Sequence, residues 1–171
     1  MSAGNSPDRS AQEFTIGRVL DAPRKLVFDA WSKPEHLARW WGPKGCAIKI
    51  EKLEFRAGGM FHYSMTLPHG VVMWGRMVYR EITAPERIVF VNSFSDAEAG
   101  ITANPWNPDW PLEVLNTITF TEEGGKTVVA LRGVPINATD TQWKTFADNH
   151  PSMSGGFNGS FDVLAAYLAT L

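Results

Sequence analysis

The sequence has a single cysteine, Cys46, among its 171 residues. One thiol cannot form an internal disulfide, and such sparse cysteine usage is typical of a reducing compartment. No stretch approaches the roughly 18–20 consecutive apolar residues that a membrane helix needs, and the polar N-terminus lacks the apolar core of a secretory signal. We therefore expect a cytoplasmic protein that has no membrane partner.

Clusters of positive charge are also missing. The formal net charge is −2, and neither Lys nor Arg follows Lys144. Nucleic-acid binding normally needs a basic patch, so we predict no nucleic-acid partner. The four histidines show no spacing typical of a zinc site, and we expect neither a metal nor a cofactor.

Large aromatic rings are abundant, with seven Trp and ten Phe against only three Tyr. Such rings either fill a large core or line an apolar pocket, and composition alone does not separate the two. The chain is long enough for one well-stabilised core. We predict a disordered leader over residues 1–11 and a single domain over 12–171.

Apolar periodicity divides the chain into strands and helices. Residues 12–20 alternate as a strand does, and two short helices follow, the second with Ser32 and Glu35 placed as a capping box. Six further strands, joined mostly by short turns, predict an antiparallel meander over residues 47–55, 60–67, 71–82, 87–94, 112–120 and 127–133.

The C-terminal segment carries the sharpest pattern. Thr139 and Gln142 are spaced as a capping box, and Pro151 should kink the helix or restart it. Beyond it, apolar residues recur at helical spacing as one continuous stripe: Met153, Phe157, Phe161, Leu164, Leu168 and Leu171. A stripe of this length must be buried, and the sheet is the available partner. The pattern predicts an α+β fold in which a seven-stranded antiparallel sheet wraps around one long helix.

Several local motifs accompany this order of elements: Asp21-Ala22-Pro23, Val27-Phe28-Asp29-Ala30-Trp31, Leu37-Ala38-Arg39-Trp40-Trp41-Gly42-Pro43, Phe55-Arg56-Ala57-Gly58-Gly59, Tyr79-Arg80-Glu81-Ile82 and Gly155-Gly156-Phe157. Together they resemble the activator-of-heat-shock-protein-90-ATPase-like family of the Bet v 1/START-like (SRPBCC) superfamily. The resemblance implies a helix-grip fold, in which the curved sheet holds the last helix over a cavity. It implies no single activity, because relatives include lipid carriers, aromatase/cyclases and co-chaperone domains.

Aromatic and methionine side chains are the candidate cavity lining. One helix cannot fill the concavity of a seven-stranded sheet, and rings and flexible Met side chains are suitable linings for the remaining space. We predict that the cavity is lined by Phe61, Tyr63, Met65, Met73, Met77, Tyr79, Phe90, Phe157 and Phe161. A long Trp- and Pro-rich loop over residues 104–111 is predicted to be a lid that carries Trp106 and Trp110.

Few ionisable groups are candidates for chemistry. Strand parity places Glu81 on the face of Met77 and Tyr79, although pairing with Arg87 is the favoured role. His62 alternates with buried-type residues and is expected to face solvent. Cys46 has no orienting base in the sequence and is interpreted as a packed thiol.

These observations favour a binding module that encloses a small, mostly apolar molecule without transforming it. Two alternatives stay open. One is an aromatase/cyclase- or hydrolase-like enzyme that would draw on Tyr63, Tyr79 or Glu81 in the same cavity. The other is a co-chaperone-type contact with heat-shock protein 90.

Overall fold

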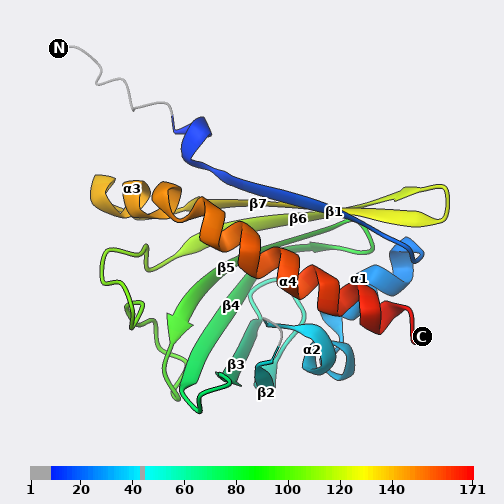
Figure 1. Cartoon of the computed structure of the whole chain (residues 1–171), viewed down its shortest axis with the longest axis horizontal. Coiled ribbons are helices and arrows are strands. Elements are labelled where there is room, and N and C mark those ends of the chain that lie inside the picture. Colours follow the sequence, from blue (N-terminus) through cyan, green and yellow to red (C-terminus); the bar gives the residue numbers. More distant parts are fainter. Residues whose placement is uncertain (1–8, 43–44) are drawn as a thin grey trace.

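The structure, a computed structural model, describes residues 9–42 and 45–171. Seven strands and four α-helices are found in this part of the chain (Figure 1). Their bounds are β1 Phe14–Leu20, α1 Arg24–Ser32, α2 Pro34–Trp40, β2 Ala47–Leu53, β3 Met60–Thr66, β4 Val72–Thr83, β5 Arg87–Ser95, β6 Val114–Glu123, β7 Lys126–Pro135, α3 Asp140–Asp148 and α4 His150–Leu168.

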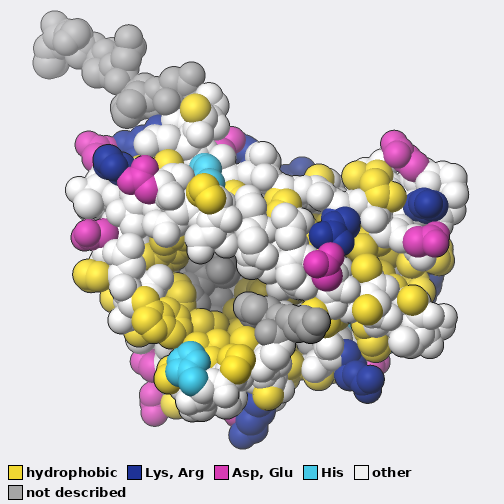
Figure 2. Space-filling model, in the orientation of Figure 1, with side chains coloured by type: hydrophobic (Ala, Val, Ile, Leu, Met, Phe, Trp, Pro, Cys, Tyr) yellow, Lys and Arg dark blue, Asp and Glu magenta, His cyan; other side chains and the backbone are white. Residues whose placement is uncertain are grey.

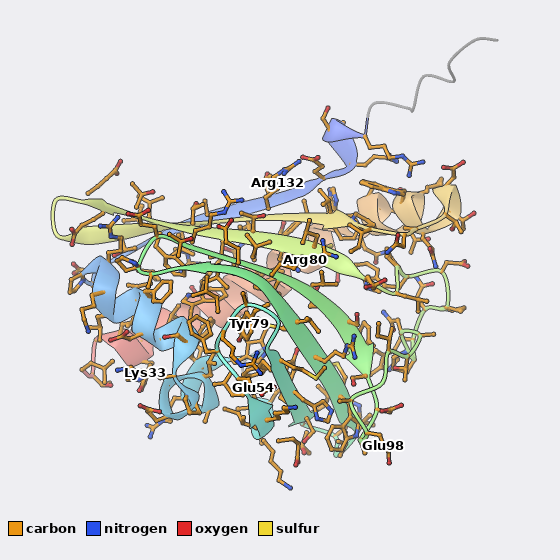
Figure 3. All side chains as sticks on the ribbon, turned by 180° about the vertical axis from the view of Figure 1, so that it is seen from behind. Lys33, Glu54, Tyr79, Arg80, Glu98 and Arg132 are labelled. Carbon is orange, nitrogen blue, oxygen red and sulfur yellow. The ribbon has the colours of Figure 1, made fainter. Side chains whose placement is uncertain are left out.

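All seven strands form one antiparallel sheet in the order β1-β7-β6-β5-β4-β3-β2. The sheet curves around α4, which crosses its concave side from α3 at one end to α1 and α2 at the other (Figure 1). Seen from behind, the sheet lies in front of α4 (Figure 3). The predicted α+β helix-grip architecture is confirmed.

The strands form because apolar and polar residues alternate along them. Phe61 and Tyr63 of β3 and Met77 and Tyr79 of β4 are all buried on the concave side. Cross-strand pairing places Phe61 directly opposite Met77. Since side chains alternate between the faces of a strand, these residues contribute to one continuous apolar surface.

Helices α3 and α4 begin as the sequence predicts. The Gln142 backbone N–H donates to Thr139 Oγ1 at 3.1 Å, and the Thr139 N–H donates to Gln142 Oε1 at 2.9 Å, which completes the capping box. Helix α3 ends at Asp148, and α4 begins at His150 with Pro151 in its first turn. Proline is tolerated there because the first N–H groups of a helix have no partner within it.

The predicted capping box at Ser32 is wrong. Ser32 is the last residue of α1, and its hydroxyl donates to the Asp29 carbonyl at 3.2 Å. The N-cap of α2 is Lys33, which makes no side-chain cap. Pro34 follows it and fixes the backbone of the first helical residue, so α2 can begin without the box.

The apolar stripe of α4 packs against the sheet through its second half. Phe161, Leu164 and Leu168 are buried, whereas Leu171 is 56% exposed because the helix has already ended. Arg18 of β1 ties the helix to the sheet edge, since its guanidinium donates to Asp162 at 2.9 Å and lies over the Phe161 ring at 5.7 Å.

The predicted leader over residues 1–11 falls mainly outside the described residues. Arg9, near the end of this predicted leader, lies over the Trp143 ring at 4.7 Å and donates a hydrogen bond to the Asp140 carboxylate of α3. A short 3₁₀ turn spans Ser10–Gln12. Within the described ranges, the helices are all too short or too polar to cross a membrane.

Candidate functional site

A cavity of about 240 Å³ lies between α4, the sheet and the α1–α2 pair. Figure 2 shows a hollow below the first half of α4, with hydrophobic side chains along its lower edge. Its volume is near the lower end of small-molecule pockets, roughly 300–1,000 Å³. The lining residues are Trp31, Trp40, Trp41, Gly42, Met65, Met73, Phe90, Asn92, Asn116, Met153, Gly156, Phe157, Ser160 and Phe161.

Three tryptophans form one wall, which we call the Trp wall: Trp31 of α1, Trp40 of α2 and Trp41 just after it. Their ring centroids are 4.8–5.8 Å apart and all three pairs meet edge to face, the arrangement that aromatic quadrupoles favour. Trp40 Nε1 also donates to the Ala30 carbonyl at 2.7 Å. These contacts hold the rings in fixed orientations.

A glycine allows the chain to turn away from the Trp wall towards β2. Gly42 has φ +102°, a conformation that residues with a side chain rarely adopt. A Cβ at this position would lie 2.9 Å from both Sδ and Cε of Met65. The glycine thus gives Met65 room to line the cavity.

The cavity lining contains three polar side chains, two on the sheet and one on α4. Asn116 of β6 and Asn92 of β5 are joined by a hydrogen bond of 2.8 Å, in which Asn116 Nδ2 donates to Asn92 Oδ1. Asn116 Nδ2 also donates to the Val114 carbonyl at 3.2 Å. Ser160 lies on α4 on the other side of the cavity. We refer to Asn92, Asn116 and Ser160 as the polar cluster.

Ionisable side chains are missing from the described part of the lining. The two buried tyrosines lie outside it, and burial raises the pKa of both the Tyr63 and the Tyr79 phenol. Both are therefore neutral at physiological pH, and neither is a ready proton donor.

Five of the predicted lining residues are brought together in the cavity: Met65, Met73, Phe90, Phe157 and Phe161. Three others, Phe61, Met77 and Tyr79, line a void of about 10 Å³ that borders Trp31, Trp41 and Phe90. Tyr63 packs into the core, where a Cβ on its cross-strand neighbour Gly75 would lie 2.5 Å from its phenol oxygen.

The two tryptophans of the predicted lid lie apart from this cavity. Both line a neighbouring surface pocket of about 390 Å³, which shares Met153 with the cavity. Trp110 is half-buried and packs against Phe146 at 5.5 Å between ring centroids, whereas Trp106 is 57% exposed.

Sequence reasoning missed the Trp wall and the polar cluster. The wall residues occupy apolar helix positions, which look the same whether they fill a core or line a space. Asn92 and Asn116 did give a signal, because each occupies an inward position in a strand whose other inward positions are apolar. A buried amide on such a face needs a hydrogen-bonding partner.

Two predictions about individual side chains are wrong. His62 does not face solvent: it is 5% exposed, stacks on Trp74 at 5.2 Å, and its Nε2 donates to the Asp96 carbonyl at 2.8 Å. The chain just after β5 lies against the outer face of the sheet at this point and helps to bury the His62 ring. Glu81 does not share the face of Tyr79, because a β-bulge between them shifts the alternation.

Glu81 instead pairs with Arg87 on the protein surface, with 2.8 Å between Arg87 Nε and Glu81 Oε2. This is the role that the sequence favoured. Cys46 is half-buried and lines a neighbouring groove between α2 and α4, which shares Trp40, Trp41 and Gly42 with the cavity. Over residues 9–42 and 45–171, no three His, Cys, Asp or Glu side chains come together as a metal site would require.

Solved structures with the same fold come from several bacteria. A protein from Arthrobacter aurescens is 25% identical, with a TM-score of 0.79 over 97% of this chain and 91% of its own. A Mycobacterium smegmatis protein, Ms6760, is 24% identical, with a TM-score of 0.74 over 95% and 94% of the two chains. DynU16, a protein from the dynemicin biosynthetic locus, is 16% identical, with a TM-score of 0.63 over 93% of this chain and 48% of its own.

No protein of curated function matches the sequence. The family model described as "Activator of Hsp90 ATPase homolog 1-like protein" matches residues 21–169, which include the Trp wall, the polar cluster and all of α4. The chain therefore belongs to the activator of Hsp90 ATPase homolog 1-like family.

Proposed function

We propose that this protein is a binding module that encloses a small, mostly apolar molecule between α4 and the concave side of the sheet. The observation that carries the proposal is the cavity of about 240 Å³ with three Trp rings and two Phe rings of α4 around it. Burying the apolar surface of a ligand there contributes about 25 cal/mol per Å² of surface removed from water. The family membership and the fold support the proposal.

The lining favours binding over catalysis. General acid–base chemistry needs a titratable group within hydrogen-bonding reach of the reacting atom. The described lining offers only indole N–H, amide and hydroxyl groups, none of which titrates near neutral pH, and Glu81 lies outside the cavity. The neutral Tyr63 and Tyr79 belong to the packing behind the Trp wall rather than to the lining.

The loop over residues 104–111 is a proposed border of the cavity mouth. This proposal is supported by Met153, which lines both the cavity and the surface pocket of Trp106 and Trp110. An exposed ring such as that of Trp106 can cover a ligand that fills the mouth. Trp110 packs on Phe146 and anchors the loop.

Two adjacent glycines of α4 allow a matched test of the site. A Cβ at Gly155 or at Gly156 would meet no atom within 4 Å, but only Gly156 lines the cavity. We expect Gly156→Leu to fill the cavity and to abolish the binding of naphthalene measured by calorimetry. Gly155→Leu, the same change one residue earlier, should leave that binding unchanged.

Tryptophan fluorescence gives an independent readout, because Trp31, Trp40 and Trp41 all border the space that a ligand would fill. Naphthalene should quench or shift the emission of the wild type and of Gly155→Leu, and leave that of Gly156→Leu unchanged. If the wild type binds neither naphthalene nor a polar derivative of it, or if both variants bind naphthalene equally well, the cavity is not a binding site and the proposal is wrong.

A further inference from the structure

We infer that the ligand of this cavity is a small, uncharged aromatic molecule whose polar group both donates and accepts a hydrogen bond, as a phenolic hydroxyl or a primary amide does. The inference rests on the proposed function and adds the chemical class of the ligand to it. The polar cluster of Asn92, Asn116 and Ser160 carries the inference.

The orientation of the two amides follows from their neighbours. The Val114 carbonyl can only accept a hydrogen bond, so the Asn116 side chain must turn its Nδ2 towards it, at 3.2 Å. The second proton of Nδ2 is donated to Asn92 Oδ1 at 2.8 Å. An amide nitrogen has two protons, and both are now engaged.

The pair therefore presents one unused acceptor and one unused donor. Asn116 Oδ1, Asn92 Nδ2 and Ser160 Oγ have no hydrogen-bonding partner within the described ranges. Asn116 is 6% exposed and Ser160 9%, so these groups lie at the cavity rather than in bulk water. A ligand that forms hydrogen bonds with these groups therefore binds more tightly than one that leaves them without a partner.

The complementary ligand group must donate to Asn116 Oδ1 and accept from Asn92 Nδ2. A hydroxyl does both, and so does a primary amide. An ether or a ketone only accepts, and would leave Asn116 Oδ1 without a partner. A carboxylate also only accepts, and it would set its negative charge beside that oxygen.

Charge on the ligand is disfavoured by the rest of the lining. Moving an ion out of water is unfavourable unless a counter-charge or several hydrogen bonds replace its hydration. The described lining supplies no Lys, Arg, His, Asp or Glu. Its rings, from Trp31, Trp40, Trp41, Phe90, Phe157 and Phe161, instead favour edge-to-face or stacked contact with a flat ring.

Gly133 positions the acceptor of the pair. It lies opposite Asn116 on β7, and a Cβ there would come within 3.0 Å of Asn116 Oδ1. A side chain at this position would therefore crowd the oxygen that the ligand must reach. The Gly133→Ala change perturbs the polar cluster without removing any of its atoms.

A set of naphthalene derivatives of similar shape tests the inference by calorimetry: naphthalene, 2-naphthol, 2-methoxynaphthalene, 2-naphthoate and the 2-naphthyltrimethylammonium ion. We expect 2-naphthol to bind at least about tenfold more tightly than the methoxy compound, the carboxylate and the cation, which is the effect of one additional hydrogen bond. Tighter binding of the cation would point to a cation–π site instead and would overturn the inference.

Protein variants assign the preference to the polar cluster. Asn116→Leu keeps a similar shape and should remove the tenfold preference for 2-naphthol, while the affinity for naphthalene changes less than about threefold. Gly133→Ala should reduce the same preference in part. If Asn116→Leu does not fold, as judged by its thermal unfolding, Asn92→Leu provides the same comparison from a half-buried position.

The outcomes separate the two proposals. If none of the five compounds binds to the wild type, the proposed function itself is wrong. If naphthalene binds but 2-naphthol binds no more tightly than 2-methoxynaphthalene, the proposed binding module stands and the inferred ligand class is wrong. The same holds if the folded Asn variants keep the preference for 2-naphthol over 2-methoxynaphthalene.

Discussion

Helix α4 contains glycines whose replacement by alanine should stabilise the protein. Gly155 and Gly159 lie inside the helix, and a Cβ at either position would meet no atom within 4 Å. A glycine inside a helix is less favourable than alanine by about 1 kcal/mol, because it loses more backbone entropy on folding. No close packing offsets that loss here.

We expect Gly155→Ala with Gly159→Ala to raise the free energy of unfolding by about 2 kcal/mol, the sum of the two helix-propensity differences. For a chain of this length, that corresponds to an increase in Tm of about 4–8 °C. Urea unfolding should show a higher midpoint and an unchanged m-value, because the surface exposed on unfolding stays nearly the same.

Gly75→Ala is the matched control, with the same chemical change in the opposite setting. Its Cβ would lie 2.5 Å from both Cζ and the phenol oxygen of Tyr63, which is 6% exposed and cannot move away freely. Overpacking of this kind destabilises a core by about 1–3 kcal/mol. If the α4 double variant melts no higher than the wild type, or if Gly75→Ala is neutral, the packing described for these glycines is wrong.

Three further predictions follow from burial. Burial raises the pKa of Tyr63 in the folded protein above its unfolded value of 10.0. The free energy of unfolding is therefore unaffected by this group below pH 10 and falls as pH rises further, by up to about 1.4 kcal/mol per pH unit. In urea unfolding between pH 9 and 11, Tyr63→Phe should lose less stability than the wild type. Phe161→Asp places an unpaired charge at a site that is 0% exposed and should unfold the domain, and a soluble variant that melts cooperatively would contradict this. Trp106→Ala should change the free energy of unfolding by less than about 1 kcal/mol, because the ring is 57% exposed. Trp110→Ala, which loses its contact with Phe146, should lower it by about 2 kcal/mol or more. A large loss in both variants on thermal unfolding would show that both rings belong to the core, and a small loss in both would show that Trp110 does not anchor the loop.

Local periodicity predicted most of the fold. The strands are recognisable because inward and outward residues alternate, as along Phe61, His62 and Tyr63, and α4 because its apolar residues recur at helical spacing. The capping box at Thr139 was predictable because both its hydrogen bonds join residues three apart. Each of these features depends on neighbours in sequence.

The failures at Glu81 and His62 have a different cause, because each depends on an irregularity or on a segment that is distant in sequence. The β-bulge after Tyr79 inserts one residue and reverses the parity on which the placement of Glu81 depended. His62 lies on the outer face, as parity requires, but its burial depends on a chain segment 34 residues later. Periodicity identifies which residues face inward, and it does not identify which inward space stays unfilled.

The two sides of the cavity differ in how firmly they are held, and this bears on how a ligand would be recognised. The Trp wall is fixed by edge-to-face contacts and the hydrogen bond of Trp40. In α4, the buried residues begin only at Ser160, and the half before it carries all three of the helix's glycines. Low burial and unfavourable helix propensity mark segments that open most easily, so the first half of α4 is the side expected to adjust to the size of a ligand. The polar cluster lies mainly on β5 and β6, in the middle of the sheet, where it cannot adjust in the same way. We therefore expect the cavity to tolerate variation in the apolar body of a ligand and to discriminate strictly at its polar group.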